Sequence, residues 1–218
     1  DQFHYVDRTL SDTIVAQNDA LVPISDDVNR MLNEIAIQNG QIKTTEQVYG
    51  NANEMRDHRD YLIRQLSENM GVKYTENTDG TTDVFVTRGA VTVYLVKGTQ
   101  AGSLSLSAPP ANYTVTAHDA VVPATTAVVD NLMYTSTDGG KLWATLQMRD
   151  TYLPDYQLKV NTLASAIVTE VNDLHNNVKS ATGAYDLVGN AGVDLFLETA
   201  LTAKNISLSI SDPTKLAA

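Results

Sequence analysis

The sequence predicts an α+β fold: a discontinuous, mainly α-helical bundle domain with long helices, plus an inserted small all-β domain. Apolar residues recur every three or four positions up to about residue 71 and again from residue 141, as they do along one face of a helix. Between these segments the period falls to about two, and β-branched runs alternate with turn residues. We therefore assign residues 1–71 and 141–218 to the helical domain and residues 72–140 to the β domain.

Pro23 is expected to kink or end the first helical segment. Residues 3–21 have helical composition, but a proline inside a helix removes a hydrogen bond, and its ring clashes with the preceding turn. Ser25 is then expected to restart the helix as its N-cap. The next apolar residues alternate spacings of four and three around one asparagine, as in helices packed nearly parallel: Val28, Leu32, Ile35, Asn39 and Ile42.

A second helix is expected to begin with Asn53 as its N-cap and to end before Gly71. On its polar side, Arg56 with Asp60 and Asp60 with Arg64 are i,i+4 pairs of opposite charge. Its expected apolar face consists of Met55, Leu62, Ile63, Leu66 and Met70.

The β domain is expected to contain about five to seven short strands, the first of them from Val72. Asn77-Thr78-Asp79-Gly80 has the composition of a hairpin turn between the first two strands. The β-branched runs that predict the later strands are residues 83–87, 91–96, 104–106, 113–116 and 128–134.

The helical period returns at Lys141, and Pro154 again requires a kink or a new helix start. A long helix should follow, to about Lys179, with a seam that we expect to be covered within the chain. Residues 205–210 alternate between polar and apolar and predict a C-terminal strand. The expected seam consists of Leu153, Tyr156, Val160, Leu163, Ile167, Glu170 and Leu174.

Composition limits the partners of the chain. Its 218 residues carry a net charge of −11, which argues against a nucleic acid or an anionic membrane surface as the main partner. No run of about 18 apolar residues predicts a membrane-spanning segment. The absence of cysteine excludes disulfides and cysteine-ligated metals. The first residues, from Asp1, include neither an initiator methionine nor a signal-peptide pattern, which we expect of a fragment or a processed chain.

No motif in the sequence indicates an enzyme. His58-Arg59-Asp60 matches the start of a protein-kinase catalytic loop, but the asparagine, the glycine-rich loop and the Asp-Phe-Gly that accompany it are missing. A charged helix face is the simpler interpretation. The four histidines lack the spacing of metal ligands: His4, His58, His118 and His175. We expect no catalytic residue, no cofactor and no metal.

Several segments resemble one known family, in the same order along the chain. Residues 56–67, Arg-Asp-His-Arg-Asp-Tyr-Leu-Ile-Arg-Gln-Leu-Ser, closely resemble the hook-associated protein 1 family of bacterial flagella, and residues 33–42 resemble its preceding run. Residues 139–154 resemble the family's return to its helical domain, and residues 171–175 with 183–196 resemble its closing helix and glycine loop. Within the β insert, the chain shares only the spacing of its turn residues with that family. The residues that carry the family pattern, for which we expect structural roles, are Arg56, Asp57, Arg59, Asp60, Leu62, Leu66, Ser67, Arg149, Asp150 and Asn172.

This resemblance implies a structural component of the flagellum that links the hook to the filament. The implied partners are the hook protein, the second junction protein, copies of itself in the full-length form and an export chaperone, and the implied location is extracellular, after export through the flagellar channel. Family members carry terminal apolar heptad segments that this chain lacks, so we expect this fragment to be monomeric. The alternative is a surface binding module or adhesin, with the β domain carried on a helical stalk.

Overall fold

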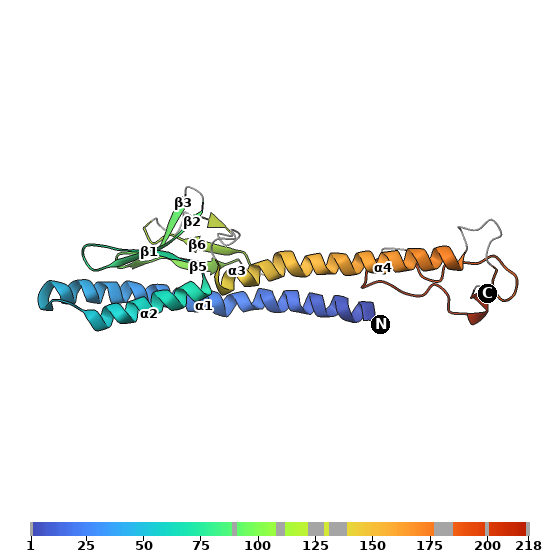
Figure 1. Cartoon of the computed structure of the whole chain (residues 1–218), viewed down its shortest axis with the longest axis horizontal. Coiled ribbons are helices and arrows are strands. Elements are labelled where there is room, and N and C mark those ends of the chain that lie inside the picture. The colour runs from blue at the N-terminus through green and yellow to red at the C-terminus, as the bar shows by residue number, and fades with distance from the viewer. Residues whose placement is uncertain are drawn as a thin grey trace. The chain divides into compact units, whose positions relative to one another are not determined.

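The computed structural model has the α+β fold that the sequence predicts. Figure 1 shows the whole chain, and the structure describes residues 2–88, 91–107, 112–121, 129–130, 139–176, 185–198 and 201–216. The described α-helices are α1 (Gln2–Tyr49), α2 (Asn53–Asn69), α3 (Gly140–Gln147) and α4 (Leu153–His175). A π-helical turn, Met148–Tyr152, lies between α3 and α4, and a short 3-10 turn covers Pro213–Lys215.

The chain forms two compact units. The larger unit contains residues 16–149, and the smaller unit contains residues 1–15 together with residues 150–218. The first turns of α1 belong to the smaller unit and the rest of α1 belongs to the larger unit. All of the described strands therefore belong to the larger unit.

Helix α1 is continuous over 48 residues and contains Pro23. A helix end at Pro23 and a restart at Ser25 are therefore wrong, while a kink at Pro23 stays a prediction. Proline removes one main-chain hydrogen bond from the helix, but Leu21 and Ser25 are buried on either side of it, and their packing offsets that loss. The predicted seam of α1 is confirmed, because each of its residues is buried: Val28, Leu32, Ile35, Asn39 and Ile42.

Helix α2 begins at Asn53, and its N-cap is Ala52, so the prediction of Asn53 as N-cap is wrong by one position. A side chain from the end of α1 supports this helix start instead, because Glu46 Oε1 accepts a hydrogen bond from the Ala52 N–H at 3.2 Å. The predicted apolar face is confirmed for its four C-terminal members, Leu62, Ile63, Leu66 and Met70, which are buried.

Two antiparallel sheets lie in the larger unit. The first has the strand order β1-β2-β3-β4, with β1 (Lys73–Glu76), β2 (Thr82–Arg88), β3 (Val91–Lys97) and β4 (Gln100–Ala101). The second has the order β5-β6-β7, with β5 (Ser103–Leu106), β6 (Val115–His118) and β7 (Val129–Asp130). The predicted hairpin turn joins β1 to β2, with Gly80 at a φ of 81°. Of the strand predicted at 128–134, only β7 lies within the described residues.

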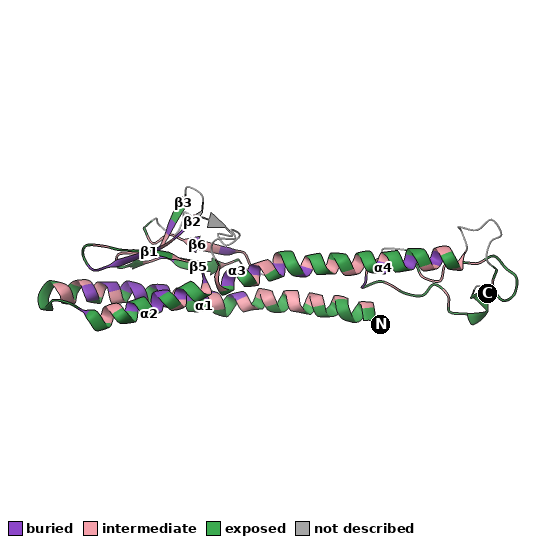
Figure 2. Ribbon diagram, viewed as in Figure 1, coloured by how far each residue is buried: buried purple, intermediate pink, exposed green. Residues whose placement is uncertain are grey.

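One hydrophobic cluster joins the helices and strands of the larger unit. Leu32 of α1, Leu66 of α2 and Leu146 of α3 belong to it, as do Val84 of β2 and Leu95 of β3. Figure 2 shows the buried residues of α1 gathered on the part that lies beside α2 and the strands. The division into a helical domain and an inserted β domain remains a prediction, and the strands of the larger unit share their core with its helices.

Pro154 marks a new helix start, as the sequence predicts. The π-helical turn ends at Tyr152, and α4 begins at Leu153 with Pro154 in its first turn. Proline is tolerated there because the first N–H groups of a helix have no partner within it. Helix α4 ends at His175, and the predicted continuation to Lys179 lies outside the described residues.

The buried face of α4 is not the predicted seam. Its buried residues are Leu153, Ala164, Val168 and Asn172, of which only Leu153 belongs to that seam. The prediction that this seam is covered within the chain is therefore wrong. Irregular main chain packs against α4 here, because the Ala203 N–H donates to Asn161 Oδ1 at 2.8 Å. Small and amide side chains allow a main chain to approach this closely, and the large apolar residues are left on another face.

The strand predicted at residues 205–210 is also wrong. The structure has one isolated antiparallel bridge there, between Leu208 and Phe196. A turn precedes it, in which the Asn205 N–H donates to the Thr202 carbonyl at 3.0 Å. This turn leaves too short an extended segment for a ladder.

Candidate functional site: polar side chains that fix strands to helices

An ion-pair network joins the end of α1, the start of α2 and the β1–β2 hairpin. Glu46 accepts two hydrogen bonds from Arg56, from Nε to Oε1 at 2.6 Å and from Nη2 to Oε2 at 2.7 Å. Arg56 Nη1 also donates to Glu76, the last residue of β1. Two parallel hydrogen bonds between a guanidinium and a carboxylate fix orientation as well as distance. Arg56 therefore holds the α1–α2 connection and the hairpin together.

Arg59 is buried beneath the hairpin turn. Its Nη1 donates to the Gly80 carbonyl at 2.8 Å, and its Nη2 lies 3.6 Å from Glu76 and 3.3 Å from Asp60. Gly80 has a φ of 81°, which favours glycine, and a Cβ atom there would lie 2.6 Å from Glu46 Oε2 and would displace that carboxylate. The buried guanidinium thus satisfies a carbonyl that water cannot reach.

Two carboxyl groups of this region titrate below their usual range. Hydrogen bonds from Arg56 and from the Ala52 N–H lower the pKa of Glu46 to about 2. Hydrogen bonds from Lys43, at 2.9 Å, and from Thr81 lower the pKa of Asp79 to about 2. Both groups are therefore charged in the folded protein at any pH well above 2.

These lowered pKa values predict a loss of stability in acid. Since the folded-state pKa lies below the unfolded-state pKa, the stabilisation is complete above about pH 4.5 and is lost as the pH falls toward 2. Glu46→Gln should therefore lower the free energy of unfolding at pH 7, and the difference from wild type should shrink between pH 4.5 and 2. Urea unfolding over this pH range measures it, and a difference that stays constant with pH would contradict the assignment.

Asparagine side chains of α1 bind the main chain of the strands. Asn39 is fully buried and donates to the carbonyls of Thr82, at 2.8 Å, and Gly98, at 2.7 Å, while its Oδ1 accepts from the Thr82 N–H at 3.0 Å. Asn29 pairs in the same way with both main-chain groups of Leu104, at 2.7 and 2.9 Å. The side-chain amide offers both a donor and an acceptor to the main chain of one residue, so it makes the hydrogen bonds that a neighbouring strand would make.

A third asparagine of α1 connects to the buried Arg149. Asn18 Oδ1 accepts from the Tyr113 N–H at 2.8 Å and from Arg149 Nη1 at 2.9 Å, and the same Nη1 donates to the Tyr113 carbonyl at 2.8 Å. Arg149 lies in the π-helical turn between α3 and α4, so its hydrogen bonds fix this turn to α1 and to the segment before β6.

The smaller unit repeats this arrangement. Asn172 of α4 is buried, donates to the Phe196 carbonyl at 3.0 Å and accepts from the Phe196 N–H at 2.9 Å. At the start of α1, His4 Nε2 lies 2.9 Å from the Ile206 carbonyl. Loops that have little regular structure are thus held on helices by side chains.

The residues of the family pattern take different places. Leu62 and Leu66 lie in the core, and Ser67 donates to the Ile63 carbonyl one turn earlier. Asp57 is exposed, and Asp150, in the π-helical turn, is partly buried. The structure therefore brings Arg56, Arg59 and Asp60 together at the hairpin and places Arg149, Asp150 and Asn172 elsewhere.

The predicted i,i+4 pairs of α2 are wrong. Arg56 binds Glu46 and Glu76, and the ion-pair partner of Asp60 is Arg59 rather than Arg56 or Arg64. Sequence reasoning also missed Glu46, Glu76, Asn18 and Asn29. Asparagines spaced by 11 and 10 residues along α1, at 18, 29 and 39, were the only available signal. Eleven residues make about three whole turns, whereas ten residues fall about 80° short of three turns.

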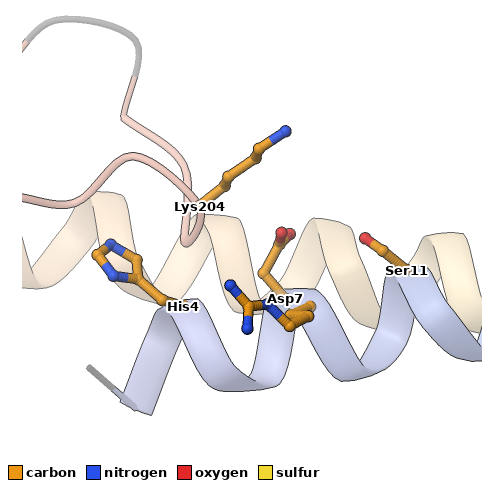
Figure 3. A pocket seen from close by; sticks show the side chains of 5 residues that line it. His4, Asp7, Ser11 and Lys204 are labelled. Atoms are coloured by element: carbon orange, nitrogen blue, oxygen red, sulfur yellow. The ribbon is translucent and has the colours of Figure 1, made fainter.

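An open hollow of about 410 Å³ lies in the smaller unit, at the start of α1. Figure 3 shows its side chains, which come from α1 and from the loop that carries Lys204. Its lining residues are His4, Asp7, Arg8, Ser11 and Lys204. Within the described part of the chain, no group of three or more His, Asp or Glu residues is placed to hold a metal ion. No described helix is long and apolar enough to cross a membrane.

Fold and contacts together define a class: an α+β protein in which long helices carry strands and loops that are fixed by side-chain to main-chain hydrogen bonds. The sequence model described as the flagellar hook-associated protein FlgK helical domain matches residues 1–196, and the chain belongs to that family. It is 27% identical over 197 residues to flagellar hook-associated protein 1 of Escherichia coli K12, and 28% identical to that of Salmonella typhimurium LT2. Each match covers 89% of this chain and 34% of the relative, so the chain spans about a third of their length.

Proposed function

We propose that this chain is the helical-domain region of a structural component of the flagellum, a subunit of the junction that links the hook to the filament. The family match over residues 1–196 carries the proposal. The relatives share the name of hook-associated protein over the same region. The subunit acts as a scaffold and not as an enzyme.

The contacts of the larger unit support a load-bearing role. A subunit between two stiff parts must keep its shape when force is applied to one of them. Arg56 and Arg59 join the β1–β2 hairpin to α1 and α2, and Asn29 and Asn39 join the strands to α1. Buried polar contacts of this kind have a narrow range of allowed geometries, so they resist sliding better than apolar packing does.

The proposed partners are the hook protein, the second junction protein and further copies of the full-length subunit. An export chaperone binds the subunit before export through the flagellar channel, and the final location is extracellular. No cofactor takes part. The residues of the family pattern stabilise the subunit, with Arg56, Arg59, Arg149 and Asn172 as its polar anchors.

Immunogold electron microscopy of the bacterium that carries this chain tests the proposal. An antibody against residues 16–149 should label a single band where hook and filament meet, and deletion of the gene should leave hooks without filaments. An adhesin would instead be labelled on the cell surface or along the filament, and its deletion would leave filaments attached. That result would overturn the proposed function.

A further inference from the structure

Asn39 is the one asparagine in the sequence that is followed by glycine. An asparagine side chain deamidates when the main-chain nitrogen of the next residue attacks its amide carbon. Glycine in that next position makes the reaction fastest, because it has no side chain to obstruct the attack and leaves the main chain free to reach the required conformation. The sequence thus places its most reactive asparagine at a buried position of α1.

The folded protein holds this pair of residues in an unreactive geometry. The Asn39 amide is fully buried, donates to the carbonyls of Thr82 and Gly98, and accepts from the Thr82 N–H. Gly40 lies inside the continuous helix α1, so its N–H belongs to the hydrogen-bond ladder of the helix. A helical ψ at Asn39 also keeps the Gly40 nitrogen out of line with the amide carbon, because the five-membered ring that must form requires a different ψ. The reaction therefore requires α1 to open and to separate from β2.

The fold does not require glycine at position 40. A Cβ atom there would lie 3.6 Å from Thr99 Cγ2, which is an ordinary contact, and the φ of Gly40 lies outside the left-handed region. Glycine inside a helix is also less stable than alanine. Gly40→Ala should therefore preserve the fold while its methyl group obstructs the attack on Asn39, so this variant separates the reaction from the structure.

The products of the reaction do not fit the folded structure. The Gly40 nitrogen loses its proton and bonds to Asn39 Cγ, the bond from Cγ to Nδ2 breaks, and ammonia leaves behind a succinimide ring. Water then opens the ring at either carbonyl carbon and gives aspartate or isoaspartate. A carboxylate has no N–H to donate to the carbonyls of Thr82 and Gly98, and its burial against them is costly. Isoaspartate also lengthens the main chain by one carbon in the middle of α1.

We propose that Asn39-Gly40 is a deamidation site that reacts only when the larger unit unfolds, and that its products prevent this unit from refolding. The rate in the folded protein equals the rate in the unfolded chain multiplied by the unfolded fraction, so folding should slow the reaction at least about 1000-fold. Each unfolding event therefore exposes the chain to a permanent loss of its folded state. The inference is independent of the proposed flagellar function.

Mass spectrometry of the tryptic peptide 31–43 measures the reaction, after incubation of the whole chain near neutral pH in native buffer or in guanidinium chloride. This peptide also contains Asn33, which precedes glutamate and serves as an internal control. In guanidinium chloride, Asn39 should deamidate well before Asn33, and the fraction that regains native Trp143 fluorescence on dilution should fall in step. In native buffer, Asn39 should stay intact over the same period. Equal rates in the two solutions, or a deamidated chain that refolds, would overturn the proposal.

Two variants test the two halves of the proposal. In guanidinium chloride, Gly40→Ala should deamidate at least several-fold more slowly than wild type and should keep its ability to refold for correspondingly longer. In native buffer, Leu66→Ala should deamidate at Asn39 at least about tenfold faster than wild type, because a weakened core raises the unfolded fraction. If Gly40→Ala loses refolding as fast as wild type, the loss arises elsewhere in the chain. If Leu66→Ala leaves the native rate unchanged, unfolding does not control the site, and either result rejects the proposal.

Discussion

Leu66→Ala is expected to lower the free energy of unfolding by about 2–5 kcal/mol, and Arg64→Ala by less than about 1 kcal/mol. Leu66 has no exposed surface and lies in the cluster shared by α1, α2, α3 and the strands. Its truncation removes buried apolar surface and leaves a cavity that neighbours fill only in part. Arg64 lies on the exposed side of α2, with its guanidinium 5.4 Å from the centre of the Tyr61 ring, a contact that solvent weakens.

Urea unfolding followed by tryptophan fluorescence measures this difference. The chain has one tryptophan, Trp143, which lies on α3 in the larger unit, so its signal reports the unit that contains Leu66. Far-UV circular dichroism in the absence of urea should be unchanged in both variants. Similar losses from the two substitutions would show that the buried and exposed faces of α2 are wrongly assigned.

Helix periodicity predicted one seam correctly and misplaced another. In α1 the residues from Val28 to Ile42 that share a stripe are also the buried ones. In α4 the stripe is equally regular, but the chain covers the neighbouring face, around Ala164 and Asn172. Periodicity identifies which residues share a face of a helix. It does not identify the face that the rest of the chain covers, because that depends on contacts distant in sequence.

The same limit explains why the sequence did not predict the partners of the polar residues. Local spacing suggested that Arg56 pairs with Asp60, yet its partners are Glu46, ten residues away, and Glu76, twenty residues away. Arg59 was assigned to a charged helix face, but the hairpin turn places the Gly80 carbonyl over it and buries it. Resemblance to the family did select Arg149 and Asn172, whose buried contacts spacing alone could not reveal.

Asn39→Leu is expected to lower the free energy of unfolding of the larger unit by about 3–6 kcal/mol. Leucine has nearly the same volume and suits the seam between Ile35 and Ile42, so lost packing contributes little. The cost arises because both main-chain groups of Thr82 and the Gly98 carbonyl lose their partner inside the protein. Each buried group left without a hydrogen bond costs about 1–3 kcal/mol.

Asn33→Leu is the matched control for Asn39→Leu. Asn33 lies on the exposed side of the same helix and donates only to the Asn29 carbonyl, at 2.8 Å, which the helix already satisfies. Its replacement should change the unfolding free energy by less than about 1 kcal/mol. The fluorescence of Trp143 in urea again follows the larger unit. If Asn39→Leu is as mild as its control, the apolar core alone holds β2 on α1, and the asparagine contacts are a consequence of that packing. A large loss confined to Asn39→Leu means that the buried amide sets the position of the strand on the helix.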